Sequence, residues 1–122
     1  DRRKAYQSFL ATVEKLTSGF SIVIFPEGTR SPDGKIGEFK KGGQLLAVRS
    51  KTPMIPVTII GSGKIIKKGG ITVNPGPIKV ILSAPIAVNE LSGGEKDEIL
   101  NVIRDIICKN YEEHVLNDGE NY

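Results

Sequence analysis

Residues 20–34 read FSIVIFPEGTRSPDG, an apolar run that ends in an acid, a glycine and an arginine. The apolar part, residues 20–25, is continuous and rich in β-branched side chains, as in a strand covered on both faces. Pro26 cannot donate to a strand ladder, and Gly28 allows a sharp backbone turn that other residues resist. The stretch therefore predicts a buried strand that stops at a turn and presents Arg30 at the edge of a sheet.

Helical and extended patterns alternate on both sides of this stretch. Apolar stripes, glycines and capping residues predict helices over residues 2–18, 41–50 and 93–115, and apolar runs predict strands over residues 20–25, 55–60 and 78–83. Ser92, followed three residues later by Glu95, forms a capping box at the start of the last helix. This alternation predicts an α/β fold, a largely parallel sheet with flanking helices.

Length and composition favour a single folded domain. The chain has 122 residues, of which 39% are hydrophobic and 25% are charged, as in ordinary globular proteins. Its longest apolar runs fall well short of the ~20 residues that a membrane-spanning helix needs. We expect residues 1–116 to form one α/β domain and residues 117–122 to form a polar tail. The single cysteine, Cys108, cannot form an internal disulfide and fits a reducing compartment.

Charge is distributed unevenly along the chain. Residues 1–79 hold 14 Lys and Arg against 5 Asp and Glu, whereas residues 80–122 hold 3 against 9. A basic half raises the local concentration of anions, so it predicts a phosphate-bearing substrate, a phospholipid surface or a nucleic acid as partner, unless it is merely a solvated surface. With three Tyr, four Phe and no stacking pattern among the lysines, nucleic acid is the poorest of these partners.

The turn after residue 25 has the chemistry of a phosphate site. Ligands of open α/β sheets lie at the carboxyl ends of strands, close to helix N-termini. Arg30 offers a planar fork of donors that matches two phosphate oxygens, and Glu27 either orients that fork or accepts a ligand hydroxyl. Lys40 and Lys41 precede a helix whose first backbone N–H groups favour an anion. The structural alternative is a Glu27–Arg30 ion pair that braces the turn.

Three segments resemble a known family: FPEGTRS at residues 25–31, FKKGG at 39–43 and TPMIPVTIIGS at 52–62. They are similar to the third and fourth conserved blocks of the glycerolipid acyltransferases, specifically the 1-acyl-sn-glycerol-3-phosphate acyltransferases, over roughly residues 1–90. The resemblance implies a partial glycerol-3-phosphate acyltransferase-like fold. The substrate-binding residues that we predict from the spacing and the resemblance are Glu27, Gly28, Thr29, Arg30, Lys40, Lys41 and Pro56.

The resemblance also implies a division of labour among these residues. In the family, the third block handles the glycerol-phosphate acceptor, a duty that falls here to Glu27, Gly28 and Arg30. The proline of the fourth block, here Pro56, is expected to help shape the side of the site that receives the acyl donor. A proline at the start of a strand is also common for purely structural reasons.

The implied reaction moves an acyl group from acyl-CoA or acyl carrier protein to 1-acylglycerol-3-phosphate and yields phosphatidate. It needs no cofactor and no metal, since the thioester is itself the co-substrate. The family's base is a histidine held by an aspartate with four residues between them. His114 is the only histidine, and three residues separate it from Asp118. We therefore expect a C-terminal portion of the enzyme that binds the acceptor, carries no catalytic residue and is inactive by itself.

Partners and rival functions follow from the same residues. The resemblance implies a membrane-associated protein on the cytoplasmic face, and Lys64, Lys67 and Lys68 in the glycine-rich connection are candidates for contact with anionic lipid. An exposed sheet edge predicts self-association. The alternative function is a non-catalytic phosphate- or anionic-lipid-binding module. The segment GSGK at 61–64 is not a nucleotide-binding loop, because Thr58 and Ile65 break the required pattern.

Overall fold

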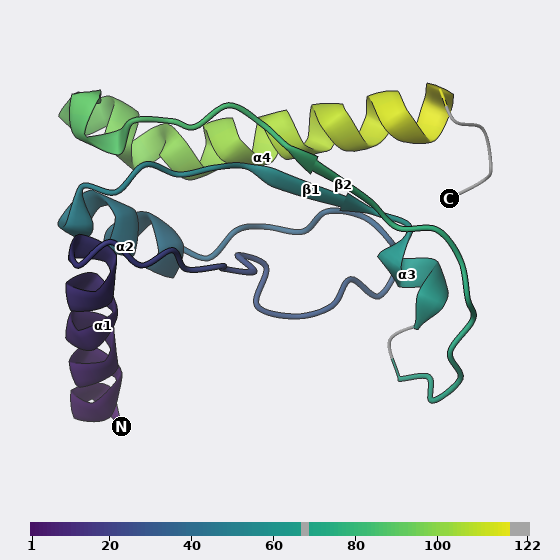
Figure 1. Ribbon diagram of the computed structural model, residues 1–122, viewed down its shortest axis with the longest axis horizontal. Helices are drawn as coiled ribbons and strands as arrows, with labels where there is room; N and C mark the ends of the chain where they lie inside the picture. The colour runs from purple at the N-terminus through teal and green to yellow at the C-terminus, as the bar shows by residue number, and fades with distance from the viewer. Residues whose placement is uncertain (67–68, 118–122) are drawn as a thin grey trace.

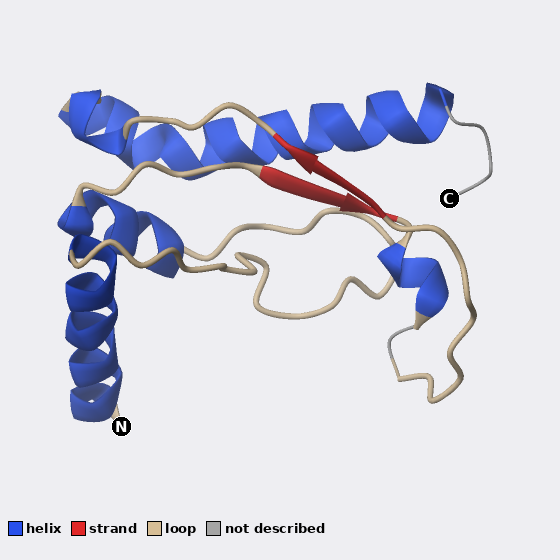
Figure 2. Ribbon diagram, viewed as in Figure 1, coloured by secondary structure: helices blue, strands red, loops and turns tan. Residues whose placement is uncertain are grey.

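The computed structural model describes residues 1–66 and 69–117. The elements follow one another as α1 (Arg2–Thr17), α2 (Gly42–Ser50), β1 (Val57–Ile60), α3 (Ser62–Ile65), β2 (Lys79–Leu82), the 3-10 turn η1 (Val88–Glu90) and α4 (Gly93–Asn117). In Figure 1 the long helix α4 lies along the two strands, α2 packs against α4 near the N-terminal end of α4, and α1 contacts α2 and projects away from it. Figure 2 shows how much of the chain between α1 and α2 is loop.

The core lies where α4 meets β1, α2 and η1. The buried apolar side chains are Ala47, Ile60, Val88, Ile99, Leu100 and Ile103. The three from α4 recur at helical spacing and form one stripe that faces the strands. Each fully buried side chain of this size contributes about 1.5–3 kcal/mol relative to an exposed one. This stripe therefore fixes where α4 sits on the sheet.

The sheet consists of β1 and β2, which pair antiparallel from Val57 with Leu82 to Ile60 with Lys79. The pairing continues beyond the strands, because the Ser83 N–H donates to the Pro56 carbonyl at 2.9 Å and Met54 bridges Ile86. Two residues lie between Ser83 and Ile86 but only one lies between Met54 and Pro56, so one extra residue bulges between these points. The α/β class is confirmed, whereas the expected parallel pairing is not found among the described strands.

The predicted strand over residues 20–25 is wrong for the described structure. These residues form no strand, and Phe20, Val23 and Phe25 are 65%, 81% and 72% exposed. The physical reason is the lack of a partner, because no other described segment supplies backbone hydrogen bonds on which residues 21–24 could form a ladder. Ile24 lies against the buried Gly43 of α2.

Alternation along β1 leaves one face of the sheet uncovered by the described residues. Pro56, Thr58 and Ile60 are buried toward α4, while Val57 and Ile59 are each 40% exposed on the other face. On the partner strand, Leu82 is 69% exposed. The two-residue period of a strand produces this contrast, because successive side chains point to opposite faces.

The three predicted helices are confirmed with small changes at their ends. Asp1 caps α1 by accepting from the Arg3 N–H at 3.0 Å. The capping box of α4 is present in its backbone half, since the Ser92 N–H donates to Glu95 Oε2 at 2.8 Å and lowers the pKa of that carboxyl. Helix α4 continues through Asn117, which the sequence placed in the tail, and residues 118–122 lie outside the described residues. That residues 1–116 form one domain stays a prediction.

No helix within residues 1–66 and 69–117 is both long enough and apolar enough to cross a lipid bilayer.

Gly61 joins β1 to α3 under two constraints. Its φ of +93° lies in the left-handed region that favours glycine, and a Cβ at this position would stand 2.5 Å from the Pro77 carbonyl oxygen. The neighbouring Gly63 has no heavy atom within 4 Å of the same position and lies inside α3. The two glycines therefore form a matched pair for substitution.

We expect Gly61→Ala to lower the free energy of unfolding by about 2 kcal/mol or more, because the alanine strains the backbone and strikes a neighbouring one. Gly63→Ala should remain within about 1 kcal/mol of the parent, toward greater stability. Chemical denaturation of both variants measures the difference. Equal stability of the two variants contradicts this account of the β1–β2 connection.

Candidate functional site

The turn at Gly28 is closed by backbone hydrogen bonds and covered by a lysine. The Gly28 N–H donates to the Phe25 carbonyl at 3.0 Å, and the Lys40 N–H donates to the Pro26 carbonyl at 2.8 Å. Gly28 has a φ of +70°, and a Cβ there would stand 2.8 Å from Lys40 Nζ. The glycine thus permits both the turn and the close approach of an ammonium group to the backbone. Two segments that the sequence singled out separately, around residues 28 and 40, meet here.

Glu27 holds the loop that connects these two segments. Its Oε2 accepts from the Gly37 N–H at 2.9 Å. The structural alternative raised by the sequence is wrong, because Glu27 and Arg30 form no ion pair in the described chain. Half-buried Glu27 therefore acts as a brace for the loop, and it leaves the arginine unengaged.

Arg30 is the exposed cation of the turn. Its side chain makes no hydrogen bond or ion pair with any residue in the described ranges, so all its donors are available to a ligand. Thr29 and Lys41 are also exposed. Lys41 stands at the N-cap of α2, where no side chain caps the helix start. The free N–H groups there add a partial positive charge beside Lys40.

Pro56 lies apart from this turn. It is among the fully buried side chains, and its carbonyl is engaged by Ser83 in the extension of the sheet. Its ring therefore offers no surface to a substrate in this arrangement. A role in shaping the acyl-donor side stays a prediction, and it would have to act through the fold.

The far side of the loop is held by Arg104 of α4, which sequence reasoning missed. Its Nε donates to the Gly37 carbonyl at 2.9 Å and its Nη2 donates to the Ile36 carbonyl at 3.0 Å. A cavity of about 360 Å³ opens beside this contact, lined by Glu38, Phe39, Asn101 and Arg104. The available signal was a lone arginine in an acidic half of the chain, and that signal does not reveal a partner 67 residues away.

The tip of the loop is a tight polar turn, as the residues SPDG predict. Asp33 Oδ1 accepts from the Ser31 hydroxyl and from the Lys35 N–H, each at 3.1 Å. The Lys35 N–H is the main cause of a lowered pKa for the Asp33 carboxyl, with the Ser31 hydroxyl next. Asp33 thus stays charged and bonded to its own turn, so it is not a candidate acid or base.

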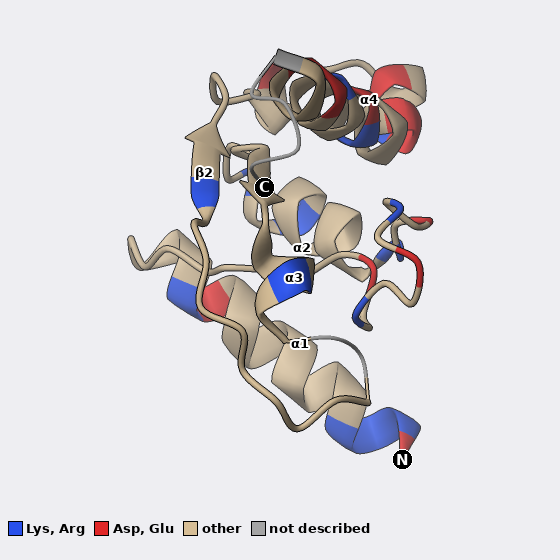
Figure 3. Ribbon diagram, turned by 90° about the vertical axis from the view of Figure 1, so that its right-hand side faces the viewer, with Lys and Arg blue, Asp and Glu red and all other residues tan. Residues whose placement is uncertain are grey.

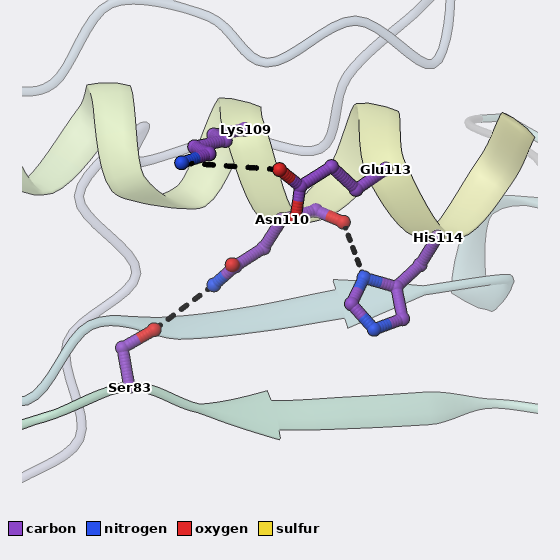
Figure 4. Close-up of polar contacts among 5 residues, drawn as sticks. All are labelled: Ser83, Lys109, Asn110, Glu113 and His114. Carbon is purple, nitrogen blue, oxygen red and sulfur yellow. Dashed lines mark hydrogen bonds and ion pairs between the residues drawn. The ribbon is translucent and has the colours of Figure 1, made fainter. Parts of the chain in front are cut away.

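His114 has a structural setting (Figure 4). Its Nδ1 lies 2.8 Å from the Asn110 carbonyl oxygen one turn earlier in α4. The Asn110 amide in turn donates to Ser83 Oγ at 2.9 Å and to the buried Thr58 Oγ1 at 3.3 Å. This network ties α4 to both strands, and it contains no nucleophile paired with a base. Within the described ranges, no group of three metal-ligating side chains converges either.

The charge asymmetry of the sequence is visible in three dimensions. Figure 3 shows acidic positions concentrated on α4, with basic positions at the start of α1 and on α3. Arg30 and Lys40 both lie within residues 1–79, the part of the chain whose net charge is positive. Such a field favours the approach of an anion.

Comparison with known proteins points to one family. The profile of the family described as Acyltransferase matches residues 1–60, which include every predicted substrate-binding residue. A 1-acyl-sn-glycerol-3-phosphate acyltransferase of Brassica napus is 39% identical over 87 residues, covering 70% of this chain and 25% of that protein. The enzyme of the same name from Borreliella burgdorferi is 33% identical over 110 residues, covering 90% of this chain and 44% of that protein.

A solved structure shares the fold. The crystal structure of the 1-acyl-sn-glycerophosphate acyltransferase PlsC from Thermotoga maritima superposes with a TM-score of 0.79 at 34% identity. The match covers 86% of this chain and 44% of that one. The chain thus spans less than half the length of each of these three relatives.

Proposed function

The chain belongs to the acyltransferase family, of whose members it spans a part, and we propose that it forms the acceptor-binding part of a lysophosphatidate acyltransferase of phospholipid biosynthesis. The observation that carries the proposal is the unengaged Arg30 guanidinium on a turn that Gly28, Glu27 and Lys40 hold in shape. The acceptor is a phosphate monoester, and a guanidinium fork pairs with two of its oxygens at once.

Each residue of the turn has a distinct task in this proposal. Arg30 grips the phosphate, and the Lys40 ammonium beside Gly28 adds a second positive charge. Glu27 positions the loop through the hydrogen bond that its Oε2 accepts from the Gly37 N–H, and its second carboxylate oxygen can accept from a hydroxyl of the acceptor. Holding the phosphate fixes where the free hydroxyl of the glycerol sits, which is a large part of the catalytic advantage in a two-substrate reaction.

The chemical step itself needs a base that the turn does not provide. The acceptor hydroxyl oxygen forms a bond to the acyl carbon of the thioester, the carbon–sulfur bond breaks, and the hydroxyl proton passes to a base. We propose no base from the residues of this chain, because its one histidine is bonded within α4 and lies far along the sequence from the turn. The acyl donor is a thioester of coenzyme A or acyl carrier protein, and no further cofactor is proposed.

We predict that Arg30→Ala, in the protein at its full natural length, raises the KM for lysophosphatidate about 10- to 100-fold, the cost of losing charge-assisted hydrogen bonds to phosphate. Arg30→Lys should recover part of that loss, since it keeps the charge without the fork. Arg49→Ala, which removes the same charge from the exposed end of α2, is the matched control.

Steady-state rates with varied acceptor, and calorimetric binding of glycerol 3-phosphate, measure this effect. An Arg30→Ala protein that binds the acceptor as well as the Arg49→Ala control removes Arg30 from its assigned role. Phosphate binding that depends on Arg30 but comes without acyl transfer supports the alternative, a non-catalytic phosphate-binding module.

We also propose that the connection between β1 and β2 rests on the membrane surface, where the lipid acceptor resides, on the cytoplasmic side. Ile71 is 99% exposed and Val73 is 59% exposed, and α3 contributes Lys64 to the same connection. Apolar side chains next to lysines suit a surface of anionic lipid. Lys67 and Lys68, which the sequence assigned to the same contact, lie outside the described residues.

This proposal predicts that Ile71→Glu weakens co-sedimentation with anionic phospholipid vesicles severalfold, because a carboxylate replaces an inserted side chain and repels the lipid. Leu116→Glu, at an 81% exposed site on α4, is the control and should bind as the parent does. Equal binding of both variants rejects this connection as the contact. Self-association through the open edges of the two-stranded sheet stays a prediction for sedimentation velocity.

A further inference from the structure

Arg104 is connected to the acceptor turn by a continuous set of short contacts. From α4, its Nε and Nη2 donate to the carbonyls of Gly37 and Ile36. The same Gly37 donates its N–H to Glu27 Oε2 at 2.9 Å. The backbone of residue 37 is therefore held from both sides, by the carboxylate of the turn through its N–H and by the guanidinium of α4 through its carbonyl.

The end of this series of contacts that lies on α4 is rigid. Arg104 follows the buried Ile103 and lies one turn after the buried Leu100, so the backbone of α4 at this point is fixed against the core. The guanidinium is half-buried and spans two consecutive carbonyls, a fork-shaped contact that a lysine cannot reproduce. The loop tip and Arg30 are exposed, in contrast, and have no anchor of this kind.

The opposite end of this series of contacts is the candidate phosphate site at the Gly28 turn. Glu27 immediately precedes Gly28, over which the Lys40 side chain lies, and the Lys40 N–H closes the base of the loop on the Pro26 carbonyl. A shift of residue 37 moves Glu27 and the turn that carries Arg30. Even small displacements of a binding group have large effects, because substrate positioning depends on fractions of an ångström.

We propose that Arg104 is a positioning residue for the acceptor: it locks the loop of residues 31–40 to α4 and thereby sets the orientation of the Arg30 turn. The inference rests on the proposed function of that turn. It adds a residue outside the segment that the family profile matches, which ends at residue 60. Arg104 does not touch the substrate, and it acts through the peptide of residue 37 and Glu27.

The test compares Arg104→Gln, Arg104→Lys and the control Lys109→Gln in the protein at its full natural length. Lys109 is an exposed cation of the same helix, and it forms an ion pair with Glu113, also of α4. Arg104→Gln should raise the KM for lysophosphatidate about tenfold, while the KM for the acyl thioester stays within about twofold. Arg104→Lys should give an intermediate value, because an ammonium engages one carbonyl, and Lys109→Gln should match the parent.

A double-mutant cycle distinguishes a positioning role from a general loss of stability, because it measures whether the effects of two substitutions on the acceptor KM depend on each other. Because Glu27 and Arg104 both act through residue 37, Glu27→Gln combined with Arg104→Lys should raise the acceptor KM by less than the product of the two single effects. Multiplying effects, an unchanged acceptor KM in Arg104→Lys and Arg104→Gln, or equal increases in both KM values overturn the proposal. Thermal unfolding identifies a variant that has lost its fold, and Arg104→Lys then decides.

The Arg30→Ala variant separates this inference from the proposed function. If Arg30→Ala weakens calorimetric binding of glycerol 3-phosphate and the Arg104 variants do not, the positioning role of Arg104 fails and the acceptor site stands. If Arg30→Ala leaves that binding unchanged, the assignment of the site fails, and the positioning role of Arg104 fails with it. Weakened binding in both, with the donor KM preserved, supports the inference.

Discussion

The packing of one apolar stripe of α4 against β1 is the constraint on which the rest of the structure depends. Ile99, Leu100 and Ile103 are buried there, opposite the buried Thr58 and Ile60. Because this is where the described chain buries most of its side chains, α4 is the firm reference for the loops around it. Asn110 extends the same contact with hydrogen bonds to both strand segments.

A site built on loops needs such a reference. Arg30 lies on an exposed turn, where a long cationic side chain is free to meet a ligand but has no packing of its own. The chain compensates with directional contacts to the loop backbone: the Glu27 carboxylate on one side and the Arg104 guanidinium on the other. Arg30 forms no ion pair with Glu27 in the described chain, and the Glu27 Oε2 instead accepts from the loop backbone. This division explains how an acid and an arginine can stand three residues apart without neutralising each other.

Local chemistry made part of the structure predictable. The helices followed from apolar spacing and from caps such as Asp1 and Ser92, and the tight turn followed from residues 31–34, because these signals act over a few residues. The convergence of the Gly28 turn with Lys40 was also expected from the sequence. Strand 20–25 was not correctly predicted, because a strand exists only when another segment pairs with it, and a pattern of apolar residues does not report the partner.

Long-range contacts account for the rest. The antiparallel direction of β1 and β2 depends on the connection between them, in which Gly61 accommodates the Pro77 backbone. The burial of Pro56, which the family resemblance assigned to the substrate side, follows from which face of β1 meets α4. The role of Arg104 could not be predicted for the same reason, since nothing near it in the sequence indicates that it reaches Gly37. The crystal structure of the protein at its full natural length with glycerol 3-phosphate tests the central claim most directly. We predict the phosphate within hydrogen-bonding distance of the Arg30 guanidinium, with the Glu27–Gly37 contact intact; a phosphate bound elsewhere, with Arg30 facing only solvent, contradicts it.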